Sequence, residues 1–170
     1  MKLISLFTAL AVTIGLFANA GRKLYQWLGP LFPGMGSLAY GIVYGLAVTG
    51  ILGAFVVSRI PNNHIPAPVF YADHYLLGFI VYMVMFVNLA GFLVFLAGLL
   101  RILPSPLSFR AGIAAGTIPL LLSAALSVYG TVHGAVIQIK PYEVQMGGKD
   151  AEKAPLRIAL ISDLHLGYVI

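Results

Sequence analysis

The sequence predicts an α-helical membrane protein with about four transmembrane helices, followed by the first strand or strands of an α/β domain. Three observations predict this fold class. The chain is 60% hydrophobic with a mean hydropathy of +0.96, and only 9% of its residues are charged. Long uncharged runs alternate with short charged segments, and the composition changes near Lys140. Water is therefore not the main solvent of the first part of this chain.

Four uncharged runs are long enough to hold the ~20 apolar residues that a spanning helix requires. They cover residues 3–21, 24–58, 75–100 and 111–139. The second run is too long for one span and begins with the helix-breaking stretch LGPLFPGMGS. We therefore expect a transmembrane module over residues 1–135, with helices at about 3–20, 38–58, 76–100 and 112–135.

The first predicted helix also has features of a signal peptide. Ala18 and Ala20 form the small-residue pattern of a cleavage site. Arg22 and Lys23 follow at once, however, and basic residues tend to hold that flank in the cytoplasm. Because the apolar stretch is also long enough to span, we expect the helix to be retained, with cleavage as the alternative.

The basic residues at the helix ends predict the orientation in the cell membrane. The first and third loops hold Arg22, Lys23, Arg101 and Arg110, whereas the N-terminus and the second loop hold Lys2 and Arg59. The more basic side is expected to face the cytoplasm. After four spans the C-terminal domain would lie on the outer face, whereas cleavage of the first helix would leave three spans and reverse it.

The charge pattern argues against nucleic acid as a partner and favours the lipid bilayer. The net charge of +5 comes from the apolar part, because residues 140–170 hold four Lys and Arg and four Asp and Glu. The cations occur singly or in pairs at the ends of apolar runs, whereas a nucleic-acid site needs them clustered on one face. Cysteine is absent from the sequence, which excludes disulfides and thiolate metal ligands.

Small and polar residues within the predicted helices have two interpretations. Gly41 and Gly45, like Gly112 and Gly116, have the spacing of a helix-pairing face, but membrane helices are rich in glycine in general, and we favour that explanation. Asn88 is expected to bond across a helix interface, and His133 to reach water near a helix end. Transport is a minority alternative, because the predicted spans contain no chain of charges.

A polar segment between the second and third predicted helices holds His64, Asp73 and His74. We interpret it as an interfacial loop that Pro66 and Pro68 restrict and that aromatic residues anchor at the headgroups. The alternative is that these side chains contact the C-terminal domain, its substrate or a metal.

Beyond the membrane module the pattern changes from helix to strand. Residues 136–155 are expected to contain one strand, interrupted or ended by Pro141, and a polar linker. Residues 156–170 begin with LRIALI, a short apolar run of the kind that forms a strand covered on both faces. A second domain is therefore expected to begin here.

Asp163 and His165 follow this predicted strand directly. Because side chains alternate along a strand, the two can point to one face while Leu164 points to the other. A carboxylate beside an imidazole suits Mn, Fe or Zn. Two ligands do not complete a site, since metal centres need three or more protein ligands.

The stretch LRIALISDLHLG resembles the first motif of the calcineurin-like metallophosphoesterases, in which an apolar strand runs into S-D-x-H-x-G. The arrangement is similar to the bacterial branch of that family with an N-terminal membrane region. The resemblance implies a layered αββα fold, two divalent metal ions, a phosphate-ester substrate and hydrolysis by a metal-activated water. It also implies that Asp163 and His165 bind one of the two ions.

The later motifs of that family, G-D, G-N-H and G-H-x-H, do not occur in the sequence. We therefore interpret the chain as an N-terminal fragment of a longer enzyme, inactive by itself. The alternative is a four-helix membrane protein without enzymatic activity, with a structural, binding or transport role, in which the D-x-H sequence occurs by chance.

Overall fold

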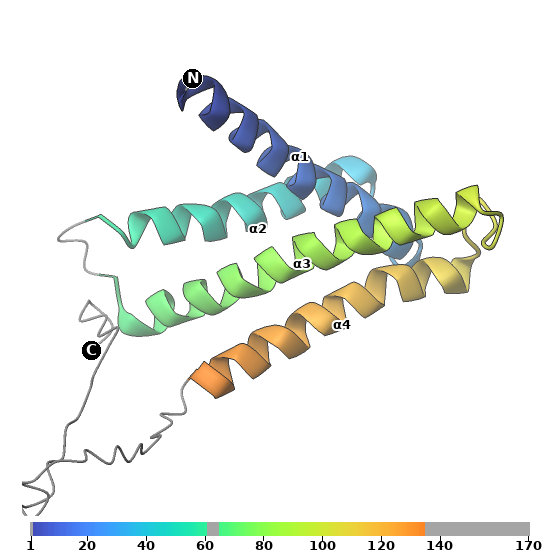
Figure 1. Ribbon diagram of the computed structural model, residues 1–170. Helices are drawn as coiled ribbons and strands as arrows, with labels where there is room; N and C mark the ends of the chain where they lie inside the picture. Colours follow the sequence, from blue (N-terminus) through green and yellow to red (C-terminus); the bar gives the residue numbers. More distant parts are fainter. Residues whose placement is uncertain (1, 61–64, 135–170) are drawn as a thin grey trace, which may run out of the picture. The chain divides into compact units, whose positions relative to one another are not determined.

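The computed structural model describes residues 2–60 and 65–134. In this part the chain forms α1 (Lys2–Leu28), the short 3-10 helix η1 (Gly29–Leu31), α2 (Ser37–Val57), α3 (Ala67–Leu99) and α4 (Phe109–Gly134), as Figure 1 shows. Four of these described elements are long and apolar enough to cross a membrane. The prediction of four helices that are long and apolar enough to span a membrane is confirmed, whereas the predicted strands and α/β domain lie outside the described residues.

The first helix is longer than the sequence predicts. α1 continues past the expected end at Ala20, through Arg22 and Lys23, to Leu28. The extra turns place Leu24 on the packed side of α1, where its side chain is only 6% exposed. The helix then ends at Gly29 and Pro30, because proline lacks the N–H that a continuing helix needs. Gly29 and Pro30, rather than the position of the charges, therefore set the end of α1.

The third helix begins earlier than expected, at Ala67 rather than near residue 76. Pro66 is its N-cap residue and Pro68 lies in the first turn, where proline is tolerated because the first N–H groups of a helix have no partner within it. The carbonyl of Pro66 accepts hydrogen bonds from the amides of Val69, at 2.9 Å, and Phe70, at 3.1 Å. The prolines therefore start the helix rather than restrict a loop.

This earlier start corrects the interpretation of the polar segment as an interfacial loop. Asp73 and His74 lie within α3, in its second turn. His64 lies outside the described residues. The prediction was wrong because it assigned Pro66 and Pro68 to a loop, although their fixed φ suits the first turn of a helix.

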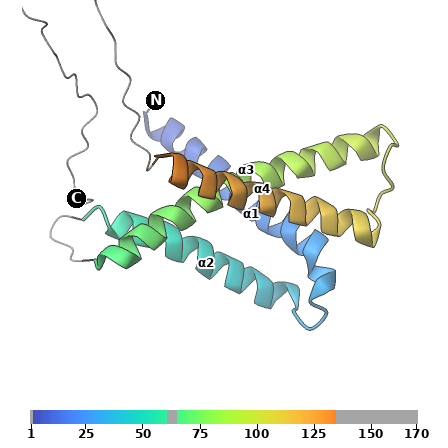
Figure 2. The same ribbon diagram turned by 90° about the horizontal axis from the view of Figure 1, so that it is seen from below.

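α3 is the central helix of the described part, as Figures 1 and 2 show from two directions. It packs against α1, α2 and α4, and α1 also packs against α4. The buried apolar core is formed by Ala20, Leu24, Trp27, Val48, Ile80, Met83, Val84 and Val87. Most large apolar side chains outside this core are exposed, as expected when lipid rather than water surrounds the helices.

α3 is also longer than one membrane crossing requires. Its 33 residues give a length of about 50 Å at 1.5 Å per residue, compared with ~30 Å for the hydrocarbon layer. Such a helix must tilt or extend beyond the apolar layer.

α4 contains an interior proline and a fully buried serine. Pro119 is buried and removes one backbone hydrogen bond from the helix. The hydroxyl of Ser123 is 0% exposed and donates to the carbonyl of Pro119 at 2.6 Å. This buried polar group is thus satisfied within its own helix and is not free for chemistry.

The glycines singled out in the sequence behave differently on the two helices. A Cβ atom at Gly116 would lie 2.7 Å from Cγ of Leu28, so α1 approaches α4 closely there. At Gly41 and Gly45 a Cβ atom would meet no described atom within 4 Å. Gly116 therefore belongs to a helix-pairing face, and the explanation by general glycine content was wrong for α4. Gly41 and Gly45, by contrast, pair with no other helix in the described part of this chain.

Replacing Gly21 by alanine is expected to destabilise the packing of α1 on α2. A Cβ atom there would lie 2.6 Å from Cε1 of Tyr44. The Tyr44 ring cannot easily move, because its hydroxyl donates to the carbonyl of Phe17 at 3.0 Å and the ring stacks on Tyr40. Overpacking of this kind costs about 1–3 kcal/mol.

Unfolding of the detergent-solubilised protein in increasing sodium dodecyl sulfate, followed by far-ultraviolet circular dichroism, measures this loss. Gly41→Ala is the matched control, since it makes the same change at an open position. We expect the control to be at least as stable as the wild type, because alanine is favoured over glycine in the interior of a helix. Equal stability of Gly21→Ala and Gly41→Ala would contradict the packing described for α1 and α2.

Candidate functional site

The predicted metal ligands Asp163 and His165 lie outside the described residues, so their arrangement stays a prediction. Within residues 2–60 and 65–134, no group of three or more histidine, aspartate or glutamate side chains could hold a metal ion. The described helices therefore provide no metal centre of their own. Their functional features are a polar bridge, a cavity and a buried carboxylate.

The polar bridge joins the middle of α1 to the middle of α3. Nδ2 of Asn19 donates to Oδ1 of Asn88 at 2.8 Å. Nδ2 of Asn88 in turn donates to the backbone carbonyls of Leu16, at 3.1 Å, and Val84, at 2.7 Å. This confirms the expectation that Asn88 bonds across a helix interface. Polar side chains inside a membrane protein stabilise helix association in this way.

Arg22 extends the polar bridge toward the end of α1. Its Nη2 donates to Oδ1 of Asn19 at 3.0 Å, while its side chain remains exposed. Arg22 lines an apolar crevice between α1 and α2, where Tyr40 and Tyr44 also lie. The neighbouring residue, Lys23, belongs to a different surface, because consecutive residues of a helix point in different directions.

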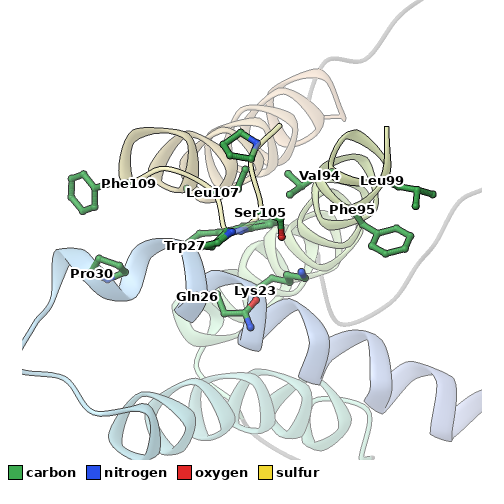
Figure 3. A pocket seen from close by; sticks show the side chains of 14 residues that line it. Lys23, Gln26, Trp27, Pro30, Val94, Phe95, Leu99, Ser105, Leu107 and Phe109 are labelled. Atoms are coloured by element: carbon green, nitrogen blue, oxygen red, sulfur yellow. The ribbon is translucent and has the colours of Figure 1, made fainter. Parts of the chain in front are cut away.

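Lys23 lines a cavity of about 680 Å³, shown in Figure 3. The cavity lies where α1, the last turns of α3, the loop after it and the start of α4 come together. From α1 it receives Lys23 and, about one turn further along the helix, Gln26 and Trp27. Val94 and Phe95 of α3 contribute apolar walls.

The geometry of Lys23 is fixed by its neighbours. Its ammonium nitrogen lies 5.7 Å from the centre of the Trp27 ring, within the range of a cation–π interaction. Trp27 itself is only 6% exposed. The aliphatic part of Lys23 lies beside Gly91, since a Cβ atom at Gly91 would be 3.5 Å from Cε of the lysine. Lys23 thus lays an apolar stem on α3 and presents its charge to the cavity.

The loop that closes the cavity begins with a tightly bonded helix end. The amide of Ile102 donates to the carbonyl of Ala97 at 2.8 Å, and the amide of Arg101 donates to the carbonyl of Gly98 at 3.0 Å. This is the bonding pattern of a Schellman motif, which requires a left-handed residue after the helix. Arg101 takes that position with φ of 56°. The chain is thereby turned sharply toward the cavity.

Asp73 and His74 lie at the other end of α3. Asp73 is 7% exposed, and its Oδ2 atom has no hydrogen-bond partner among the described residues. The His74 ring packs on Phe70 with ring centres 4.0 Å apart, and its Nδ1 lies 2.7 Å from the carbonyl of Phe70. Two potential ligands are fewer than a metal centre requires. Contact of these side chains with the C-terminal domain remains a prediction.

The structure also bears on the transport alternative. Asp73 is the one carboxylate side chain in residues 2–60 and 65–134, and His133 is exposed in the last turn of α4, stacked on Tyr129. Ion pathways through membranes are usually built from several ionisable groups that face the interior. The described helices contain no such series.

Sequence reasoning missed the Lys23 cavity because it ended the first helix at residue 20. The signal that could have found it is the spacing of Lys23 and Trp27, four residues apart, which places them on one face of a continuing helix. Because Arg22 and Lys23 were both assigned to the segment that flanks the membrane, the shared helix face of Lys23 and Trp27 was not recognised.

Comparisons of the chain with protein-family models, with curated proteins and with solved structures find no match.

Proposed function

We propose that residues 2–134 anchor a metal-dependent phosphoesterase in the cell membrane and that Asp163 and His165 are two of its metal ligands. The observation that carries this proposal is the sequence ISDLHLG after a membrane module. An apolar strand that leads into an aspartate and a histidine two residues apart provides two ligands on one face. The resemblance to the metallophosphoesterases rests on this motif.

The chemistry follows from the ligands that the motif supplies. Two divalent ions bound close together would neutralise the charge of a phosphate ester and provide a hydroxide from bound water at neutral pH. Asp163 and His165 would orient one ion, with other residues of the enzyme completing the centre. The helices have a separate task in this proposal, which is to keep the centre at the membrane surface.

The outer face is the proposed location of this centre. The last turns of α1, the loop after α3 and the first turn of α4 together hold Arg22, Lys23, Arg101 and Arg110, and positive charge tends to remain in the cytoplasm. With four spans, the segment after α4 would leave the membrane on the opposite side.

A second candidate function is a membrane protein that binds a ligand without enzymatic activity. One observation favours it, the cavity of about 680 Å³ that Lys23 and Trp27 line. This candidate needs no metal centre and treats the D-x-H sequence as a coincidence.

The reading frame of the natural gene distinguishes the two candidates. If the proposal is right, the frame continues beyond the codon of Ile170 into blocks that encode G-D, G-N-H and G-H-x-H. A stop codon directly after Ile170 in an intact gene would contradict the phosphoesterase and favour the binding protein.

A further inference from the structure

The cavity beside Lys23 has a cation with no acidic partner among residues 2–60 and 65–134. Among the residues that line it, Lys23 alone is ionisable. Asp73, the one carboxylate of the described residues, lies in the second turn of α3. Val94, which lines the cavity, lies near the other end of that helix. The two positions are about 30 Å apart along the helix axis at 1.5 Å per residue. The charge of Lys23 is therefore not neutralised by the described part of the protein.

The walls of the cavity are mainly apolar. Val94 and Phe95 of α3 and Leu107 and Phe109 on the α4 side surround the space, as Figure 3 shows. Gln26 and Ser105 add two uncharged polar side chains next to the lysine. Free inorganic phosphate would leave these apolar walls without a partner. A ligand that combines a negative charge with an apolar portion fits the whole lining.

The position of the cavity along the helices indicates where such a ligand comes from. The cavity lies at the end of the described helices that also holds Arg22, Arg101 and Arg110. Tryptophan and lysine side chains with apolar stems are typical of the membrane–water interface, at the level of the lipid headgroups. Basic pockets between membrane helices at this level suit anionic lipid headgroups.

We propose that this cavity binds one anionic phospholipid of the bilayer. The ammonium of Lys23 pairs with the phosphate, and Gln26 and Ser105 donate hydrogen bonds to the headgroup. Trp27 orients the lysine through the cation–π contact, while Val94 and Phe95 contact the part of the acyl chains nearest the headgroup. This site is separate from Asp163 and His165 and does not depend on the proposed phosphoesterase.

The position of the single tryptophan of the chain allows a direct test. Trp27 is that residue and lines the cavity, so its fluorescence reports which lipids are nearby. The full chain is reconstituted into phosphatidylcholine vesicles that contain a small, equal mole fraction of either brominated phosphatidylglycerol or brominated phosphatidylcholine. Bromine quenches tryptophan on contact. We expect stronger quenching by the anionic lipid than by the zwitterionic lipid of the same acyl chains.

Neutral variants of Lys23 test whether its ammonium group is responsible for the preference for the anionic lipid. Lys23→Gln and Lys23→Met should each lower the apparent affinity for brominated phosphatidylglycerol about tenfold or more, the size of effect expected for a lost charge-assisted hydrogen bond. Arg110→Gln is the matched control, since it removes one positive charge from the same end of the helices at an exposed residue that does not line the cavity. The control should quench like the wild type, and circular dichroism checks that all variants keep their helices.

Three results would overturn the proposal. The first is the same quenching by both lipids in the wild type. The second is an equal loss of the difference in Arg110→Gln and in the Lys23 variants, which would indicate attraction by the general positive field. The third is relief of the quenching by millimolar glycerol 3-phosphate, which would assign the cavity to a soluble phosphate rather than a bilayer lipid.

Discussion

In the proposed phosphoesterase, expressed from its whole natural gene, Asp163→Asn or His165→Ala is expected to lower metal-dependent hydrolysis of an aryl phosphate by at least about 100-fold. Loss of an outer-shell partner of a metal ligand already costs 10- to 100-fold, and loss of a ligand itself should cost more. The neutral amide of asparagine cannot replace the charge of a carboxylate on a divalent ion. Initial rates with p-nitrophenyl phosphate, in membranes supplied with Mn²⁺ after chelation, measure the effect.

Two control variants separate loss of chemistry from loss of the protein. Asp150→Asn removes a carboxylate from the predicted linker, and His133→Ala removes an exposed histidine from the end of α4. Both should hydrolyse the substrate like the wild type, and all four variants should be present in the membrane in equal amounts. Full activity of Asp163→Asn or of His165→Ala would remove that residue from the proposed centre.

The second prediction concerns the side of the membrane on which the segment after α4 lies. A reporter enzyme that is active only after export, fused after Lys153, is expected to be fully active. The reason is the excess of Lys and Arg in the last turns of α1 and around the loop between α3 and α4, which holds these ends of the helices in the cytoplasm. Reporter activity in whole cells, corrected for the amount of fusion protein, provides the measurement.

The same reporter fused after Leu103, in the loop between α3 and α4, is the matched control and should be silent. The opposite pattern, with a silent fusion at Lys153 and an active one at Leu103, would contradict the outward orientation. It would also be the pattern expected if the first helix were cleaved and three spans remained.

The number of spanning helices could be predicted from the sequence because the bilayer fixes a minimum length of uncharged chain. Their ends were less predictable, for a physical reason. Charged residues show where a helix leaves the apolar layer, but the backbone can remain helical beyond that point until a residue such as Pro30 interrupts it. Leu24 and Trp27 are packed, so α1 continues past Lys23. Pro66 and Pro68 were likewise assigned to a loop although they suit the first turn of α3.

The contacts between helices were largely beyond sequence reasoning. The sequence indicated that Asn88 would bond across an interface, which the structure confirms. It did not indicate Asn19 as the partner, because that depends on how α1 and α3 are turned and displaced relative to each other. The Lys23 cavity was even harder to predict from the sequence, since its walls come from α1, α3, the following loop and α4. The assignment of Asp163 and His165 as metal ligands stays a prediction, because both residues lie outside the described part of the chain.

The metal content of the protein, expressed from its whole natural gene and purified from membranes, decides whether Asp163 and His165 belong to a metal centre. We expect about two divalent ions of Mn, Fe or Zn per chain, as a two-metal centre requires. We also expect a clear loss of bound metal in His165→Ala and none in His133→Ala. A protein that retains its helices but binds no stoichiometric metal, or binds it equally in both variants, would contradict the assignment of Asp163 and His165 to a metallophosphoesterase centre.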